Sequence, residues 1–295
     1  MSAVPTADFT EETSAQAVVA SLADTPDARR KEVLSSLVRH LHGFVRDVGL
    51  TQGEWDAAID FLTRTGQKCD EHRQEFILLS DVLGVSMLVD AINNRRPADA
   101  TSSTVLGPFH VVDSPVRELG DDITLGNGGG EPCVVTGEVR SLTGQPLGGA
   151  LLDVWQADET GFYDVQLPGE VPIGELRGLF TADADGRFWF RTIVPAPYPI
   201  PHDGPVGELL AATNRHPNRP AHIHVIAGAE GHDPVTTHMF VAGSPWLDSD
   251  AVFGVKENLV RPFELVDDEA RAAAHGVPSP FRHAHFDVVL RPTVR

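Results

Sequence analysis

The chain has 295 residues, of which 41% are hydrophobic, a composition typical of a globular protein with an ample core. Its 42 acidic and 23 basic residues give a net charge of −19, which argues against nucleic acid as a partner because phosphate binding needs a basic surface. Two cysteines are too few for a disulfide framework or a cysteine-ligated metal. Since no apolar run approaches 18 residues and the first residues lack a signal-peptide pattern, we expect a cytoplasmic protein without membrane insertion.

The first hundred residues carry helical patterns. Thr25 and Pro26 predict a helix start, and apolar residues then recur at helical spacing until Gly49. Thr51 and Glu54 have the spacing of a capping box and predict the start of a second helix. A third helix is predicted over residues 75–94, where nearly every face is apolar, so it must be covered by the fold or by a second subunit.

From about residue 100 onward, short β-rich runs alternate with glycine and proline turns. We therefore predict a mainly β protein with α content, in which a helical N-terminal dimerisation region (residues 1–105) precedes an antiparallel β-sandwich catalytic domain (residues 106–295). The predicted strands are 133–139, 150–157, 187–194, 222–228, 237–243 and 285–292.

Two histidines, His222 and His224, lie one residue apart in the predicted strand HIHVIAG. Side chains alternate along a strand, so both imidazoles point to the same face. An H-x-H pair alone is a weak metal signal, and a second pair at 283–285 is interpreted as structural because Asp287 continues its face toward solvent. Ile226 continues the face of the first pair, and imidazoles in such dry surroundings need partners, of which a metal is one.

The two tyrosines of the chain, Tyr163 and Tyr198, lie in loops upstream of this pair, bracketed by glycine or proline. A tyrosine is most often a half-buried aromatic side chain with its hydroxyl in water. If both tyrosines joined the histidines as ligands, their hard anionic oxygens would favour ferric iron over zinc. Cysteine is absent near the pair, so these residues are the candidate additional ligands.

The set Tyr163, Tyr198, Arg219, His222 and His224, within DVWQADETGFYDVQ, PAPYPIP and RPAHIHV, resembles the intradiol ring-cleaving catechol dioxygenases. VLGPFH at 105–110 and the helical region before it extend the resemblance over nearly the whole chain. It implies one non-haem ferric ion per chain, with Tyr163 and His222 as equatorial and Tyr198 and His224 as axial ligands beside a hydroxide. It also implies that Tyr198 and the hydroxide leave the metal and accept the substrate's protons, while Arg219 stabilises negative charge on the ring.

Within this family the chain is most similar to the branch that cleaves hydroxyquinol (1,2,4-trihydroxybenzene), through LLSDVLGVSMLVDA and THMFVAG followed by DAVFGVKENLV. His238 stands where a glutamine is expected in catechol-cleaving members, so hydroxyquinol is the expected substrate and catechol the alternative. Asp81 is expected to accept a hydrogen bond from the third hydroxyl, although a carboxylate in a helix is more commonly a surface residue. By motif position, the expected substrate-binding residues are Leu78, Asp81, Val105, Leu106, Gly107, Pro108, Phe109, Pro199, Ile200, Pro201, His238 and Val252.

The resemblance further implies a homodimer formed through the N-terminal helices, with a phospholipid in an apolar tunnel at the interface. Two readings from other classes stay open. One is a zinc hydrolase that uses His222, His224 and an acidic third ligand. The other is a non-enzymatic β-sandwich binding module in which the histidines are core residues and the tyrosines are incidental. Taken alone, Arg219 is more commonly a strand-entry arginine in a surface ion pair.

Overall fold

The computed structural model describes residues 8–70, 73–125 and 129–293. The chain separates into two compact units, residues 1–64 and residues 65–295, and the boundary falls within a helix. The functional boundary predicted at residue 105 stays a prediction. No helix in the described ranges is long and apolar enough to cross a membrane.

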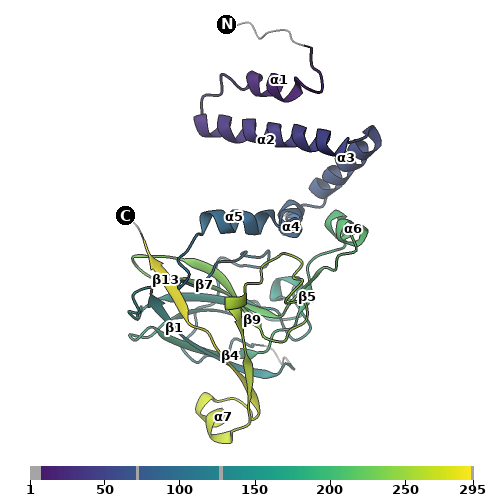
Figure 1. The fold of residues 1–295 in the computed structure, drawn as a ribbon. Helices are drawn as coiled ribbons and strands as arrows, with labels where there is room; N and C mark the ends of the chain where they lie inside the picture. Colours follow the sequence, from purple (N-terminus) through teal and green to yellow (C-terminus); the bar gives the residue numbers. More distant parts are fainter. Residues whose placement is uncertain (1–7, 71–72, 126–128, 294–295) are drawn as a thin grey trace. The chain divides into compact units, whose positions relative to one another are not determined.

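Figure 1 labels the helices of the first unit, whose boundaries follow local capping chemistry. The start predicted at Thr25 and Pro26 is wrong by two residues, because the Asp27 carboxylate accepts the backbone N–H of Arg30 and so caps the helix there. Gly49 ends the same helix in the left-handed conformation, as predicted, with φ of 60°. The capping box is also confirmed, since Thr51 and Glu54 exchange hydrogen bonds. The helices are α1 (Ser14–Ser21), α2 (Ala28–Val48) and α3 (Gln52–Gln67).

The single helix predicted over residues 75–94 is wrong. Two helices occupy this segment, α4 (Glu75–Val82) and α5 (Val85–Asn93). Gly84 separates them with φ of 72°, a conformation that a glycine adopts without steric cost and that cannot continue an α-helix. The apolar pattern runs through the break, so periodicity alone could not place it.

A β-sandwich forms the main part of the second unit (Figure 1). One sheet has the order β10-β9-β7-β2-β3, and the other has the order β11-β12-β1-β13-β8 with β4 also paired to β1. Most pairings are antiparallel, but β1 pairs in parallel with β12 and β13, and β10 with β9. The predicted order of helices followed by a β-sandwich is confirmed, and its sheets are mixed. The strands are β1 (Pro132–Ser141), β2 (Leu151–Gln156), β3 (Arg177–Thr181), β4 (Arg187–Ile193), β5 (Tyr198–Pro199), β6 (Asn218–Arg219), β7 (His222–Gly228), β8 (His232–Asp233), β9 (Val235–Val241), β10 (Val260–Arg261), β11 (Phe263–Val266), β12 (Phe281–His285) and β13 (Val288–Pro292).

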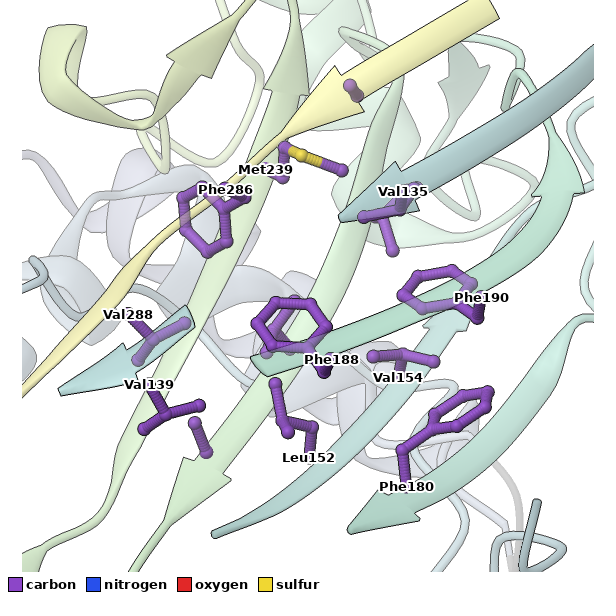
Figure 2. Packing of buried hydrophobic residues seen from close by; sticks show 14 of the residues in the cluster. Val135, Val139, Leu152, Val154, Phe180, Phe188, Phe190, Met239, Phe286 and Val288 are labelled. Atoms are coloured by element: carbon purple, nitrogen blue, oxygen red, sulfur yellow. The ribbon is translucent and has the colours of Figure 1, made fainter. Parts of the chain in front are cut away.

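The core lies between the two sheets, where alternate side chains of the facing strands meet. Figure 2 shows Leu152 and Val154 of β2 near Phe188 and Phe190 of β4. Full burial of each such side chain contributes about 1.5–3 kcal/mol. Strand β7 gives Ile223, Val225 and Ala227 to this core, which leaves its two histidines on the other face.

A second apolar cluster joins α4 to α6 (Pro205–Ala212). At the start of α4, the fully buried Glu75 carboxylate pairs with Arg73 at 2.8 Å and accepts the backbone N–H of Val206 at 3.1 Å. This pairing fixes α4 against the first turn of α6. The remaining short helices are η1 (Asp164–Gln166), η2 (Glu257–Leu259) and α7 (Glu269–His275).

Candidate metal centre

Sheet register and two loops bring the predicted site residues together. Trp155 of β2 pairs with His224 of β7, and His224 pairs in turn with His238 of β9. Beside this sheet, β5 and β6 pair Tyr198 with Arg219. Each of these pairings joins segments that lie apart in the sequence.

Four donor atoms converge on the face of β7 that is turned away from the core. The Tyr163 hydroxyl lies 3.0 Å from Nε2 of His224 and 3.2 Å from the Tyr198 hydroxyl. Nε2 of His222 lies 3.2 Å from Nε2 of His224 and 3.5 Å from the Tyr198 hydroxyl. All four side chains are buried, with at most 3% of their surface exposed. The predicted ligand set therefore forms one compact cluster.

These distances fit one shared transition-metal ion. Donors held about 2.0 Å from a common ion in cis positions lie roughly 2.9–3.3 Å apart, close to the separations in the cluster. Two phenol oxygens and two imidazole nitrogens form a mixed hard and intermediate donor set that suits iron.

The protonation states of the cluster side chains also suit the binding of a cation. Burial lowers the pKa of His222 to about 3 and that of His224 well below its ordinary value, with the positive charge of Arg219 adding to both shifts. Both imidazoles are therefore neutral and able to bind a metal. Burial, together with Tyr198, raises the pKa of the Tyr163 hydroxyl well above its ordinary value, so a phenolate at this position needs a bound cation.

Arg219 is fully buried beside the cluster. Its Nη1 lies 3.3 Å from Nε2 of His222, and its Nε and Nη2 donate to the two carboxylate oxygens of Asp250 at 3.1 and 3.3 Å. Burial alone would lower the pKa of the guanidinium, but the charge of Asp250 outweighs it and raises the pKa. The cluster thus has a permanent positive charge next to it. The burial of both Arg219 and Asp250 excludes a surface ion pair.

Aromatic rings and a glycine hold the ligands in place. Phe109 stacks on Tyr163 with ring centroids 4.6 Å apart, and Trp155 stacks on His224 at 4.5 Å with an interplanar angle of 10°. Gly107 has φ of 79°, and a Cβ there would lie 3.0 Å from Cε1 of His224. A larger residue at this position would meet both backbone strain and the imidazole.

Four of the predicted pocket residues pack into one apolar cluster. Leu78 of α4 packs in it with Ile200 and Val252, and Val105 packs against it. Asp81, also on α4, is buried, and burial raises its pKa above the ordinary value. It is close enough to Arg219 for the two charges to interact, so Asp81 is a buried residue near the site and not a helix-surface residue.

Other predicted pocket residues are less closely tied to the cluster. Leu106, Pro108 and Pro199 are exposed, and Pro201 is half-buried. Among the described contacts, none joins these four side chains to the donor atoms, and their role as substrate-binding residues stays a prediction.

His238 lies behind His224. His222, His224 and His238 have ring nitrogens within 4.8 Å of one another, which by itself is compatible with a three-histidine metal site. However, Nε2 of His238 lies 2.7 Å from Nδ1 of His224, on the side of the ring away from the two tyrosines. The two rings are therefore hydrogen-bonded to each other. His238 lies at the edge of the His224 ring that is opposite the donor cluster.

The second H-x-H pair has a different environment. His283 and His285 both lie against the Thr136 hydroxyl, at 2.9 and 3.1 Å, and Nε2 of His285 lies 3.0 Å from the Asp287 carboxylate. His285 and Asp287 are partly open to solvent. These contacts agree with the structural interpretation of this pair.

Comparison with known proteins decides the family. Residues 106–292 match the family model described as Dioxygenase, and residues 27–101 match the one described as Catechol dioxygenase N terminus. The chain is 53% identical to a hydroxyquinol 1,2-dioxygenase from Rhizobium sp. strain MTP-10005 over 91% of this chain and 90% of that protein. The chain belongs to the intradiol dioxygenase family.

Other relatives agree with this assignment. A 6-chlorohydroxyquinol 1,2-dioxygenase from Cupriavidus pinatubonensis is 50% identical, over 97% of this chain and 99% of that protein. The solved structure of a hydroxyquinol 1,2-dioxygenase from Pseudomonas putida DLL-E4 superimposes with a TM-score of 0.89 at 48% identity, covering 96% of this chain and 99% of that one. Intradiol dioxygenases are non-haem iron enzymes, so the chain that carries this donor cluster belongs to an iron-dependent family.

Sequence reasoning missed three residues that support the cluster. Asp250 holds Arg219, Trp155 stacks on His224, and Thr104 contacts His238 at 3.4 Å. Trp155 and Asp250 lie in segments that carry the family resemblance, DVWQAD and DAVFGVKENLV. No local pattern assigns either residue a partner, because the partners lie on other strands or loops.

Proposed function

We propose that this intradiol dioxygenase cleaves the ring of hydroxyquinol with O2 to give 3-hydroxy-cis,cis-muconate, the enol form of maleylacetate. The observation that carries the proposal is the convergence of two phenols and two imidazoles beside a buried arginine. The choice of hydroxyquinol as the substrate follows the relatives that are named hydroxyquinol 1,2-dioxygenases. Both oxygen atoms enter the product, so the reaction needs no external reductant.

The proposed ligands of one Fe(III) per chain are Tyr163, Tyr198, His222 and His224. When bound, the ferric ion would accept the two adjacent oxygens of the substrate as a chelating ligand and make the ring reactive toward O2. The neutral imidazoles and the raised pKa of Tyr163 support this set. A trivalent ion supplies the positive charge that a buried phenolate needs for its stabilisation.

The protein contributes proton transfer and charge stabilisation. Tyr198 would accept a proton from one substrate hydroxyl as the diol binds. Arg219, held by Asp250, then faces the negative charge that develops on the ring oxygens during cleavage. Because Asp250 holds the guanidinium in place before substrate arrives, little reorganisation is required.

The apolar cluster around Leu78, Ile200 and Val252 would form the wall that excludes water from the ring. Asp81 is the polar exception on this wall and the proposed acceptor for the third hydroxyl of hydroxyquinol. Catechol lacks that hydroxyl. Binding catechol would leave the buried Asp81 carboxylate without the hydrogen bond from that hydroxyl, which is how a polar pocket rejects a smaller analogue.

Oxygen uptake with hydroxyquinol and with catechol tests the substrate directly. We expect hydroxyquinol to be consumed with one O2 per ring, and Asp81→Leu to reduce the preference for hydroxyquinol while retaining activity on catechol. A wide preference for catechol in the wild type would overturn the substrate assignment. Hydrolytic activity with zinc and no oxygen uptake would favour the zinc reading, and no metal at all would favour a binding module.

We further propose a homodimer formed through α2. Its apolar residues recur at helical spacing yet remain exposed in the single chain. Such an arrangement is typical of a surface that a second subunit covers. The phospholipid tunnel and the cytoplasmic location stay predictions. The exposed apolar residues of α2 are Val33, Leu34, Leu37, Leu41, Phe44, Val45 and Val48.

A further inference from the structure

The two ring nitrogens of His224 face different partners. Nε2 lies in the donor cluster, 3.0 Å from the Tyr163 hydroxyl, whereas Nδ1 lies 2.7 Å from Nε2 of His238. A neutral imidazole that binds a metal through Nε2 carries its proton on Nδ1. His224 must therefore donate to His238, and Nε2 of His238 must carry no proton.

The next contacts decide whether His238 can accept that hydrogen bond. With Nε2 free, the proton of neutral His238 is on Nδ1, which lies 3.4 Å from the Thr104 hydroxyl. That hydroxyl lies 3.3 Å from the carbonyl oxygen of Gly254 and 3.8 Å from the sulfur of Met87, a much weaker acceptor. A carbonyl oxygen can only accept, so Thr104 donates to Gly254 and accepts from His238.

We propose that Thr104 and His238 form a hydrogen-bond relay, anchored at the Gly254 carbonyl, that keeps Nε2 of His224 unprotonated and directed at the metal. The inference rests on the proposed iron site. Thr104 and His238 are positioning residues, because they act on the metal only through His224. The relay also assigns His238 a role different from the substrate contact predicted from the sequence.

The other histidine of the cluster reaches the same arrangement by a shorter route. Nδ1 of His222 lies 2.7 Å from the carbonyl oxygen of Pro220, which fixes its proton on Nδ1 and frees Nε2. His224 lies between β2 and β9 in the sheet, where its neighbours are the side chains of Trp155 and His238. The relay therefore provides for His224 what a single backbone carbonyl provides for His222.

Burial makes the relay sensitive to the loss of one partner. Thr104, His224 and His238 are at most 3% exposed, so bulk water cannot replace a missing group. The residue that ends the relay also supports the arginine, because the N–H of Gly254 donates to Asp250 at 2.9 Å. The loop that follows Asp250 thus supports both the ligand and the neighbouring positive charge.

Thr104→Val and Thr104→Ser form a matched pair of test variants. Valine keeps the shape of threonine but removes the hydroxyl, whereas serine keeps the hydroxyl. After loading with iron, we would measure iron per chain, the rate of iron loss to excess chelator and the visible absorption band. Loss of an outer partner of a ligating histidine typically weakens metal binding about 10- to 100-fold, so we expect a loss of that size in Thr104→Val and wild-type retention in Thr104→Ser.

His238→Gln and His238→Leu give a second pair that does not depend on the folding of the first. The amide oxygen of glutamine can accept from Nδ1 of His224, and leucine cannot, so glutamine should retain more iron. Thermal unfolding of the metal-free proteins checks that each variant folds. Wild-type iron retention and an unchanged band in both Thr104→Val and His238→Leu would overturn the relay. A wild type that takes up no ferric iron would instead overturn the proposed function itself.

Discussion

Replacing Asp250 with asparagine removes the counterion of Arg219 while keeping the size of the side chain. Both partners are 2% exposed, and the carboxylate also accepts the N–H groups of Val252 and Gly254 at 3.3 and 2.9 Å. Leaving the guanidinium buried without its anion is expected to lower the free energy of unfolding by about 3–5 kcal/mol. That loss is a large share of the roughly 5–15 kcal/mol that stabilises a typical protein.

The effect of Asp250→Asn should depend on pH. Burial alone would raise the pKa of Asp250, but the charge of Arg219 outweighs it and holds the pKa below its ordinary value. A carboxyl group with a lowered folded-state pKa adds stability above its unfolded pKa of about 3.9 and loses that contribution as the pH falls through the folded value. The difference between wild type and variant should therefore be full near neutral pH and shrink in acid.

Urea unfolding followed by tryptophan fluorescence at several pH values measures this difference. Asp185→Asn is the control, because Asp185 pairs with Arg187 at 3.6 Å while both side chains are 69% exposed, and such pairs contribute at most about 1 kcal/mol. Adding Arg219→Met to Asp250→Asn removes both buried charges and should restore part of the lost stability. If Asp250→Asn is no more destabilising than Asp185→Asn near neutral pH, the reasoning is wrong.

Three further predictions concern other parts of the chain. Glu75→Gln should lower the free energy of unfolding by about 3 kcal/mol, since Glu75 is fully buried against Arg73, and an unchanged urea midpoint would contradict this. Gly107→Ala should cost about 1–2 kcal/mol through its positive φ and reduce iron content by displacing His224, so wild-type iron content would refute the steric argument. Leu41→Glu should convert a dimer into a monomer in sedimentation velocity, and a variant that stays dimeric would exclude this face of α2.

Local patterns were enough to predict strand β7, which carries the two histidines of the cluster. Alternation along HIHVIAG placed His222 and His224 on one face and the core residues on the other, as the structure has them. Their position in loops upstream made the two tyrosines candidate ligands, but only the family resemblance assigned them to the site, because β5, η1 and β7 meet through tertiary packing. The capping box at Thr51 and the glycine end at Gly49 were predictable for the same reason as the strand, since both depend on near neighbours.

Residues whose partners lie far along the chain could not be found this way. Thr104 lies 134 residues before His238, and Asp250 lies 31 residues after Arg219. Neither has a local pattern that separates it from an ordinary loop residue. The break at Gly84 was missed because the apolar residues continue across it, and strand β3 was missed because its five residues include an arginine and a glycine.

The visible absorption spectrum of the purified protein, together with its iron content, tests the central claim most directly. Two phenolates on ferric iron give a red to burgundy colour through charge transfer, so we expect a visible band, about one iron per chain and a weakened or shifted band in Tyr163→Phe. A protein that stays colourless and iron-free after anaerobic iron loading and exposure to air would contradict the proposed centre.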